Sequence, residues 1–234
     1  MAWLGQLFRP KVDLPVTVAN AVDAWRALPG ISDRVLISET RFVVLDVETS
    51  GLNPRRDRLL SIGALAVEHM HMAPRQAYNA VLRNDRPSTR ENVLVHGLTP
   101  TRQAAGELPE RALSDFLDFV GKAPCVAFHA TFDRTVLDRA LRAELGVRLA
   151  NPWLDLAQLA PILFPEARLV YGTLDEWLAY FRLRVHTRHD AVHDAHATAE
   201  LFLILLARAG ARGISTLAQL RATGHKHLRI TTGG

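Results

Sequence analysis

A buried strand followed by two acids is predicted by the segment Arg41-Phe42-Val43-Val44-Leu45-Asp46-Val47-Glu48-Thr49-Ser50-Gly51-Leu52. Its apolar, β-branched first half is typical of a strand covered on both faces. Asp46 and Glu48 lie two residues apart, so on an extended strand their side chains share a face. Two carboxylates on one spot repel each other unless a cation lies between them, and oxygen ligands suit Mg²⁺ or Mn²⁺. A strand end that is polar because it meets solvent is the alternative for this segment taken alone.

The composition bounds the fold and the partner. The chain has 234 residues, 48% of them hydrophobic, which is enough for one large α/β domain with a short appendage. A net charge of +4 and a pI near 9.7 favour an anionic partner. Lysine occurs only at Lys11, Lys122 and Lys226, so most of the positive charge is arginine, which suits forked contacts with phosphate. A GC-rich genome would produce the same bias.

The single cysteine and the lack of long apolar runs narrow the class of protein. Cys125 excludes an intramolecular disulfide, and its apolar surroundings predict a buried, inert thiol. The apolar stretch at the start is too short for a signal peptide, and no later run reaches membrane-spanning length. We therefore expect a soluble, cytoplasmic protein that does not associate with a membrane.

The pattern along the chain predicts a mixed sheet with helices on its faces. Strands are expected at 42–45, 59–67 and 78–82, joined by short connections that favour antiparallel neighbours, and at 125–128. Residues 92–100 are expected to form a loop that serves a ligand. Helices are expected from a cap at Thr17 to Leu28, from about 108 to 120, from 132 onward, and at roughly 155–163, 173–181, 190–209 and 215–222.

Two further acids stand where they could reach the same site. Asp133 follows the predicted strand 125–128 at the start of a helix, and ligands of α/β proteins bind at that edge of the sheet. Asp194 lies near the start of another helix, five residues after His189. Each has an alternative: an acid in a first turn stabilises the helix dipole, and the cluster His186, His189, His193 and His196 admits a transition-metal site.

Together these residues resemble the DEDDh 3′-to-5′ exonucleases, the family that includes the proofreading subunit of the bacterial replicative polymerase and RNase T. The matching motifs are Asp46-Val-Glu48-Thr-Ser-Gly-Leu52, His129-Ala-Thr-Phe-Asp133 and His189-Asp-Ala-Val-His-Asp194, in the family's order over residues 40–208. The segment Val95-His96-Gly97-Leu98-Thr99 resembles the one that many members place against the terminal nucleotide. Many members have an asparagine where this chain has His129, so different contacts to the substrate strand are expected here.

The resemblance implies an α/β, ribonuclease H-like fold: a mixed five-stranded sheet flanked by helices. The expected division is an N-terminal helical extension (1–38), an exonuclease domain (39–210) and a C-terminal helix with a basic tail (211–234). By resemblance Asp46, Glu48, Asp133 and Asp194 hold two divalent cations, Mg²⁺ or Mn²⁺, and His189 is the general base. The implied substrate-binding residues are Thr49, Gly51, Leu52, His96, Gly97, Leu98, His129 and Phe132.

The resemblance leaves the polymer open. The implied reaction releases nucleoside 5′-monophosphates from the 3′ end of single-stranded DNA or RNA, and the family makes a DNA polymerase a candidate partner. For Leu52 the alternative is a buried turn residue, and Gly51 could answer only a need for positive φ. An inactive nucleic-acid-binding module associated with a polymerase is the competing function, and a zinc-binding protein is the third.

Overall fold

The fold is built on a five-stranded mixed sheet with the order β3-β2-β1-β4-β5. The computed structural model describes residues 13–86, 88–167, 172–184 and 190–231. β1 (Phe42–Thr49) lies at the centre of the sheet, antiparallel to β2 (Leu59–Glu68), which in turn pairs antiparallel with β3 (His71–Val81). On the other side β1 runs parallel to β4 (Cys125–Ala127), and β4 runs parallel to β5 (Trp153–Asp155). The carboxyl ends of β1, β4 and β5 therefore meet at one edge.

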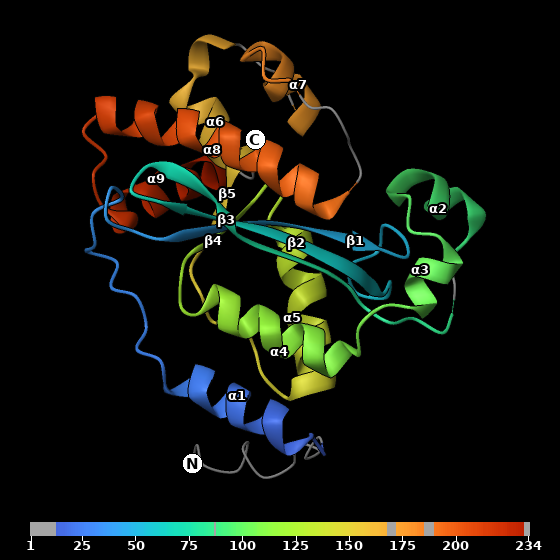
Figure 1. Cartoon of the computed structure of the whole chain (residues 1–234). Helices are drawn as coiled ribbons and strands as arrows, with labels where there is room; N and C mark the ends of the chain where they lie inside the picture. The colour runs from blue at the N-terminus through green and yellow to red at the C-terminus, as the bar shows by residue number, and fades with distance from the viewer. Residues whose placement is uncertain (1–12, 87, 168–171, 185–189, 232–234) are drawn as a thin grey trace.

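Helices cover both faces of the sheet (Figure 1). One face carries α1 (Val16–Ala27), α4 (Pro109–Val120) and α5 (Thr131–Leu145). The other carries α6 (Leu156–Leu163), the 3₁₀ turn η1 (Pro165–Ala167), α7 (Leu174–Tyr180), α8 (Ala191–Ala211) and α9 (Leu217–Thr231). Two short helices, α2 (Arg90–His96) and α3 (Pro100–Ala104), lie beside the end of β1. This three-layer arrangement confirms the predicted ribonuclease H-like architecture.

Alternation along β1 sends its side chains to two separate cores. Val43, Leu45 and Val47 pack with α1, α4 and α5, whereas Phe42 and Val44 pack beneath α8 and its neighbours. Asp46 and Glu48 continue the even-numbered series, so both acids project from the face that α8 covers. The prediction that these two side chains share a face is confirmed.

Several expected elements differ from those observed. Residues 92–100 are not a simple loop, because Thr89 and Thr99 accept backbone N–H groups and cap α2 and α3. Thr17 does not cap α1, which begins at Val16 after Pro15 without a side-chain cap. β5 was missed because three residues are too few for a periodic signal. β3 starts earlier than expected and α9 continues beyond the predicted 215–222.

The terminal helices pack on the sheet domain. Val22 and Trp25 of α1 are buried against α4, and the Trp25 indole N–H donates to the carbonyl of Gly121 at 2.8 Å. α9 packs on α6 and β5 through Leu217 and Leu220. The division into 1–38, 39–210 and 211–234 stays a prediction. Within the described ranges, none of the helices has the length and apolar character needed to cross a membrane.

A glycine in β2 lets α8 approach the sheet. Gly63 pairs with Asp46, and a Cβ built on Gly63 would lie 2.1 Å from the carbonyl carbon of Ala191 and 2.2 Å from the amide nitrogen of Val192. The first turn of α8 thus rests directly on the β2 backbone. Any side chain at position 63 would push this turn, and the nearby Asp194, away from β1.

We expect Gly63→Ala to lower both thermal stability and affinity for divalent cations. The added methyl group would collide with backbone atoms that cannot rotate away, and overpacking of this kind costs about 1–3 kcal/mol. Thermal unfolding with and without Mg²⁺ measures both effects. The matched control is Gly210→Ala in α8, where a Cβ meets nothing within 4 Å. An equal Mg²⁺-dependent shift in the two variants would contradict this role for Gly63.

Candidate metal centre

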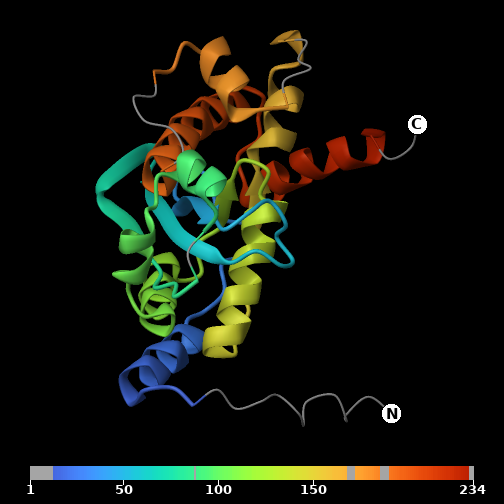
Figure 2. The same cartoon turned by 90° about the vertical axis from the view of Figure 1, so that its right-hand side faces the viewer.

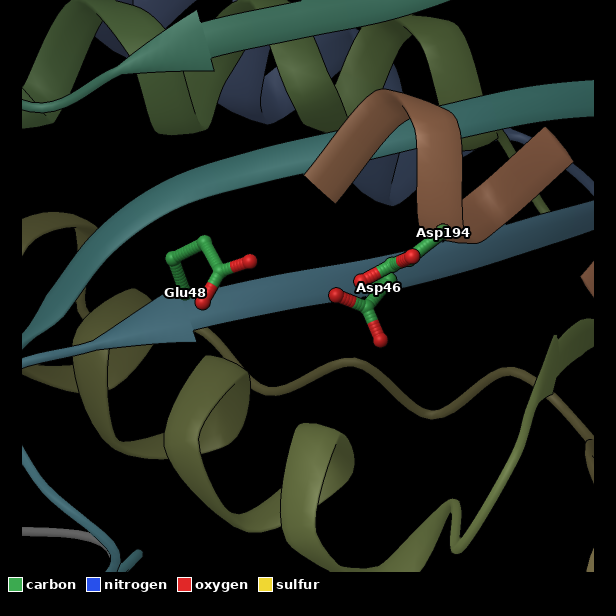
Figure 3. A group of neighbouring side chains, drawn as sticks. All are labelled: Asp46, Glu48 and Asp194. Atoms are coloured by element: carbon green, nitrogen blue, oxygen red, sulfur yellow. The ribbon is translucent and has the colours of Figure 1, made fainter. Parts of the chain in front are cut away.

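Three carboxylates from distant parts of the chain converge at the end of β1. One oxygen each from Asp46, Glu48 and Asp194 lies within 4.8 Å of the other two. Figure 3 shows Asp46 and Glu48 projecting from β1 and Asp194 reaching down from the first turns of α8. Asp194 is buried and the other two are half-buried. The acids predicted from the first and third motifs are therefore neighbours.

Asp133 reaches the same place from the opposite core because β1 is longer than β4. The N–H of Val43 donates to the carbonyl of Pro124, which precedes β4, and N–H groups two apart on a strand point the same way. The N–H of Val47 consequently points toward β4's side, but β4 ends at Ala127, opposite an earlier part of β1. The carboxylate of Asp133 accepts this N–H and lies close enough to Glu48 to feel its charge. An acid thus replaces the missing strand at this point.

Burial disfavours the charged form of the Asp133 carboxyl group when no cation is bound. Its side chain is only 4% exposed, and desolvation raises its pKa to about 8, with the charges of Asp155 and Glu48 adding to the effect. Hydrogen bonds from the backbone N–H groups of Asp133 and Val47 act in the opposite direction. A carboxyl group in this state is stabilised as a carboxylate by any nearby positive charge.

The donor set fits a hard divalent cation. Two oxygens bound to one ion at about 2.0–2.6 Å lie at most about 4–5 Å apart, which matches the grouping of Asp46, Glu48 and Asp194. All three ligands are carboxylates, and among the described residues no histidine or cysteine joins the group. Oxygen-only ligands favour Mg²⁺ or Mn²⁺ over zinc. Asp133, beside Glu48, extends the acidic surface on which cations can be held.

Asp155 helps to position Asp133, although the sequence pattern did not point to it. It ends β5, caps α6 by accepting the N–H of Ala157 at 3.0 Å, and accepts the N–H of His129 at 3.0 Å and that of Ala130. His129 has a positive φ of 60°, a strained conformation for a residue with a side chain. Asp155 therefore holds the turn between β4 and α5 that leads into Asp133. Burial raises the pKa of Asp155, while the His129 charge and these hydrogen bonds lower it.

The loop after β1 presents Leu52 to solvent. Leu52 is 92% exposed, which rules out the buried-turn alternative. Thr49 donates its hydroxyl to the carbonyl of Gly51 at 2.6 Å. Gly51 lacks a positive φ, so the backbone-conformation explanation is wrong; a Cβ there would instead lie 2.5 Å from the Asp57 carboxylate. The loop is tied to α2 because the Asn92 side-chain amide donates to the carbonyl of Ser50.

The expected substrate segment at 96–98 is partly inward-facing. The His96 ring is buried and its Nδ1 accepts the N–H of Leu98 at 3.0 Å, and burial lowers its pKa. The Leu98 side chain is also buried, and the expectation that this residue binds the substrate stays a prediction. Only Gly97, with φ of 66°, is exposed. The exposed apolar side chains here are Leu94 and Val95. Both lie in α2, where the sequence pattern predicted a loop.

Some of the remaining predicted site residues lie in the described part of the chain, and others lie outside it. His129 is exposed and its Nε2 lies 2.7 Å from the carbonyl oxygen of Gly172, and Phe132 is half-buried against the core beside Asp133. His189 lies outside the described residues, as does His186. His193 is exposed and pairs through Nδ1 with the N-cap Asp190 at 3.0 Å, and His196 is exposed too.

Comparisons with known proteins agree with this geometry. A family described as "Exonuclease" (RNase T type) matches residues 43–202. The chain is 27% identical over 198 residues to a PolC-type DNA polymerase III of Thermotoga maritima, covering 85% of this chain but 14% of that protein. It is 29% identical over 197 residues to a DNA polymerase III subunit epsilon-like protein of Rhodobacter capsulatus, covering 83% of this chain and 28% of that one.

Solved structures share the fold. E. coli exonuclease I in complex with a dA16 oligonucleotide aligns with a TM-score of 0.64 and 19% identity, over 74% of this chain and 42% of that chain. Exonuclease X in complex with 5′ overhanging duplex DNA aligns with a TM-score of 0.62 and 22% identity, over 78% of this chain and 99% of that one. This chain therefore spans a small part of the two polymerase relatives but nearly all of exonuclease X.

The raised pKa of Asp133 predicts a specific pH dependence of stability. Without metal, the folded chain keeps a proton on Asp133 up to about pH 8, whereas the unfolded chain releases it near pH 4, so stability falls as pH rises between these values. We expect the free energy of unfolding of the wild type in EDTA, relative to that of Asp133→Asn, to fall over this range by at most about 1.4 kcal/mol per pH unit. Added Mg²⁺ should stabilise the wild type more at about pH 8 than at about pH 5, because protons compete with the cation for the carboxylates. A difference between the two proteins that does not vary with pH would contradict the assignment.

Proposed function

This chain belongs to the exonuclease family, and we propose that it removes nucleotides from the 3′ end of DNA by hydrolysing phosphodiester bonds. The observation that carries the proposal is the convergence of Asp46, Glu48 and Asp194, with Asp133 beside Glu48. Four acids at the carboxyl edge of a sheet have no structural need to be together. Their grouping supports a centre for two divalent cations, Mg²⁺ or Mn²⁺, of the DEDDh type.

The chain's own residues would prepare this chemistry. When bound, two divalent cations neutralise the phosphodiester, lower the pKa of water and stabilise the departing 3′ oxygen. Asp46, Glu48 and Asp194 would hold them on the α8 face of β1, and Asp133 would do so from the β4 edge. His189 precedes His193 by four residues and Asp194 by five. We propose that His189 takes the proton from the attacking water. The products would be nucleoside 5′-monophosphates.

Selection of a chain end requires a wall beside the reacting bond. The exposed Leu52 and the Thr49–Gly51 turn lie in the loop after β1. The Asn92–Ser50 hydrogen bond joins this loop to α2, the helix that the exposed Gly97 caps. We propose that these groups receive the 3′ nucleotide, with Leu52 against its base. His96 would act as a positioning residue, because its buried ring fixes the backbone N–H of Leu98.

DNA is proposed as the polymer because of what the similar proteins are. The relatives are DNA polymerase III proteins, and the two solved structures hold DNA. A DNA polymerase is proposed as a partner on the same ground, and a cytoplasmic location would be consistent with it. RNA trimming and an inactive binding module are the alternatives that the following experiment separates.

We expect the purified protein with Mg²⁺ or Mn²⁺ to shorten 5′-labelled single-stranded DNA progressively and to release labelled mononucleotide from 3′-labelled DNA. RNA and duplex DNA of the same sequence serve as parallel substrates. Asp46→Ala and Asp133→Ala should lower the rate by about 10³-fold or more while the circular dichroism spectrum is kept, since each removes a cation ligand. Full activity in either variant would exclude the assignment, and binding without hydrolysis by the wild type would favour the inactive module.

For His189→Ala we expect a loss of rate of about 10²–10⁴-fold, the usual contribution of a general base. Mg²⁺-dependent stabilisation should be largely kept, because the carboxylates remain. The matched control is His193→Ala, which removes an exposed imidazole that pairs with Asp190 on the same helix start. If His193→Ala loses the rate and His189→Ala keeps it, the base is His193.

A further inference from the structure

One face of α5 is strongly basic. Arg134, Arg139 and Arg142 fall within an arc of about 140° when residues are placed about 100° apart around the helix. The opposite face carries Val136, Leu137 and Leu141, which are fully buried in the core. The amphipathic character of α5 therefore sets an apolar side against a side with three arginines and one acid, Asp138.

This arginine face forms the floor of a hollow whose walls are also basic. Arg55, from the loop between β1 and β2, and Arg148, just beyond α5, line the hollow together with the three helix arginines. Figure 2 shows the loop between β1 and β2 lying against the start of α5. A second hollow shares Arg139 and adds Arg56, Arg58 and Arg83. We call these eight residues the arginine groove.

Among the described residues, only Arg142 of the arginine groove pairs with an acid. The first hollow contains one acid, Asp138, which is buried; one of its oxygens accepts the N–H of Leu149 at 3.1 Å and the other lies 3.5 Å from Arg142. Glu144 lines the second hollow, and burial and the charge of Glu110 raise its pKa. Among the described residues, the guanidinium groups of Arg55, Arg134, Arg139 and Arg148 form no ion pair with an acid. These forks are available for an external anion.

The arginine groove begins beside the metal centre. Arg134 directly follows Asp133 in α5, and Arg55 lies three residues beyond Leu52 in the loop that leaves β1. From Asp133 to Arg142 the helix rises about 14 Å, which corresponds to about four base steps along the axis of a B-form strand. A polymer whose last nucleotide lies at Leu52 would meet these arginines with its preceding nucleotides.

We propose that the arginine groove binds the sugar-phosphate backbone of the substrate strand upstream of its 3′ end. This inference rests on the proposed function, since it takes the metal centre as the place where that end lies. Each guanidinium would donate forked hydrogen bonds to phosphate oxygens. Contacts of this kind hold the strand without reading its bases, so the groove would set affinity for long substrates and not sequence preference.

The chemistry of the lining favours a nucleic acid over an acidic protein surface. Apart from Asp138, the first hollow is lined by arginines and by Thr131 and Thr135, with no exposed large apolar side chain. Protein interfaces are anchored by buried apolar and aromatic groups, which are absent from this lining. Backbone phosphates need only charge and hydrogen-bond donors.

The test compares Arg139→Gln/Arg148→Gln with the control Arg26→Gln/Arg111→Gln, whose arginines lie on α1 and α4 and pair with Asp23 and Asp115. Binding of a labelled DNA of about 20 nucleotides is measured in EDTA by fluorescence anisotropy over a range of salt concentrations. The groove variant should lose about 1.4 from the slope of log K against log salt for single strands, or about 1.8 for duplex, since two contacts are removed. The control should retain the wild-type slope. Arg55→Gln, on the facing loop, provides an independent variant with half the loss.

A second measurement separates this inference from the proposed function. With Mg²⁺, a fourfold rise in salt should lower the ratio of kcat/KM for the long DNA to that for the p-nitrophenyl ester of thymidine 5′-monophosphate about sevenfold more in the wild type than in the groove variant, because the variant makes two fewer phosphate contacts. Failure of the wild type to hydrolyse either substrate would refute the exonuclease proposal, while the slope in EDTA would still test the groove. An unchanged slope in both groove variants would overturn the inference.

Discussion

Repulsion among closely grouped acids is the constraint on which this structure depends. Asp46, Glu48 and Asp194 are held within 4.8 Å of one another, and Asp133 is buried beside Glu48 with a raised pKa. Bringing carboxylates this close together costs free energy, and bound protons or cations lower that cost. The surrounding elements must therefore be rigid enough to keep the acids together, and the two cores on either side of the sheet supply that rigidity.

Three local features bring the acids to the end of β1. β1 continues past the end of β4, which frees the Val47 N–H for Asp133. Gly63 lets the first turn of α8 touch the sheet, which brings Asp194 over Asp46. Asp155 accepts the N–H groups at the start of the β4–α5 turn and so sets the direction in which α5 begins. Each acid reaches the site from a different element, yet all are fixed through backbone contacts.

The charges of the molecule are arranged as opposites around this point. The acids gather at the end of β1, while arginines from α5 and the adjacent loop gather a short distance away. Cations drawn to the first group and phosphates drawn to the second would lie side by side, as a phosphodiester substrate requires. In the sequence, the exposed Leu52 lies between Glu48 and Arg55, in the loop that leaves β1.

Local patterns in the chain were enough to predict the central strand, the shared face of Asp46 and Glu48, most helices and the family. These depend on periodicity and on short motifs, which are properties of neighbouring residues. The three-residue β5, the helices within 90–104, the inward position of Leu98 and the importance of Gly63 and Asp155 emerged only from the tertiary structure. Each depends on contacts between segments far apart in the chain. The sequence around a single glycine or a three-residue strand does not indicate which distant segment packs against it.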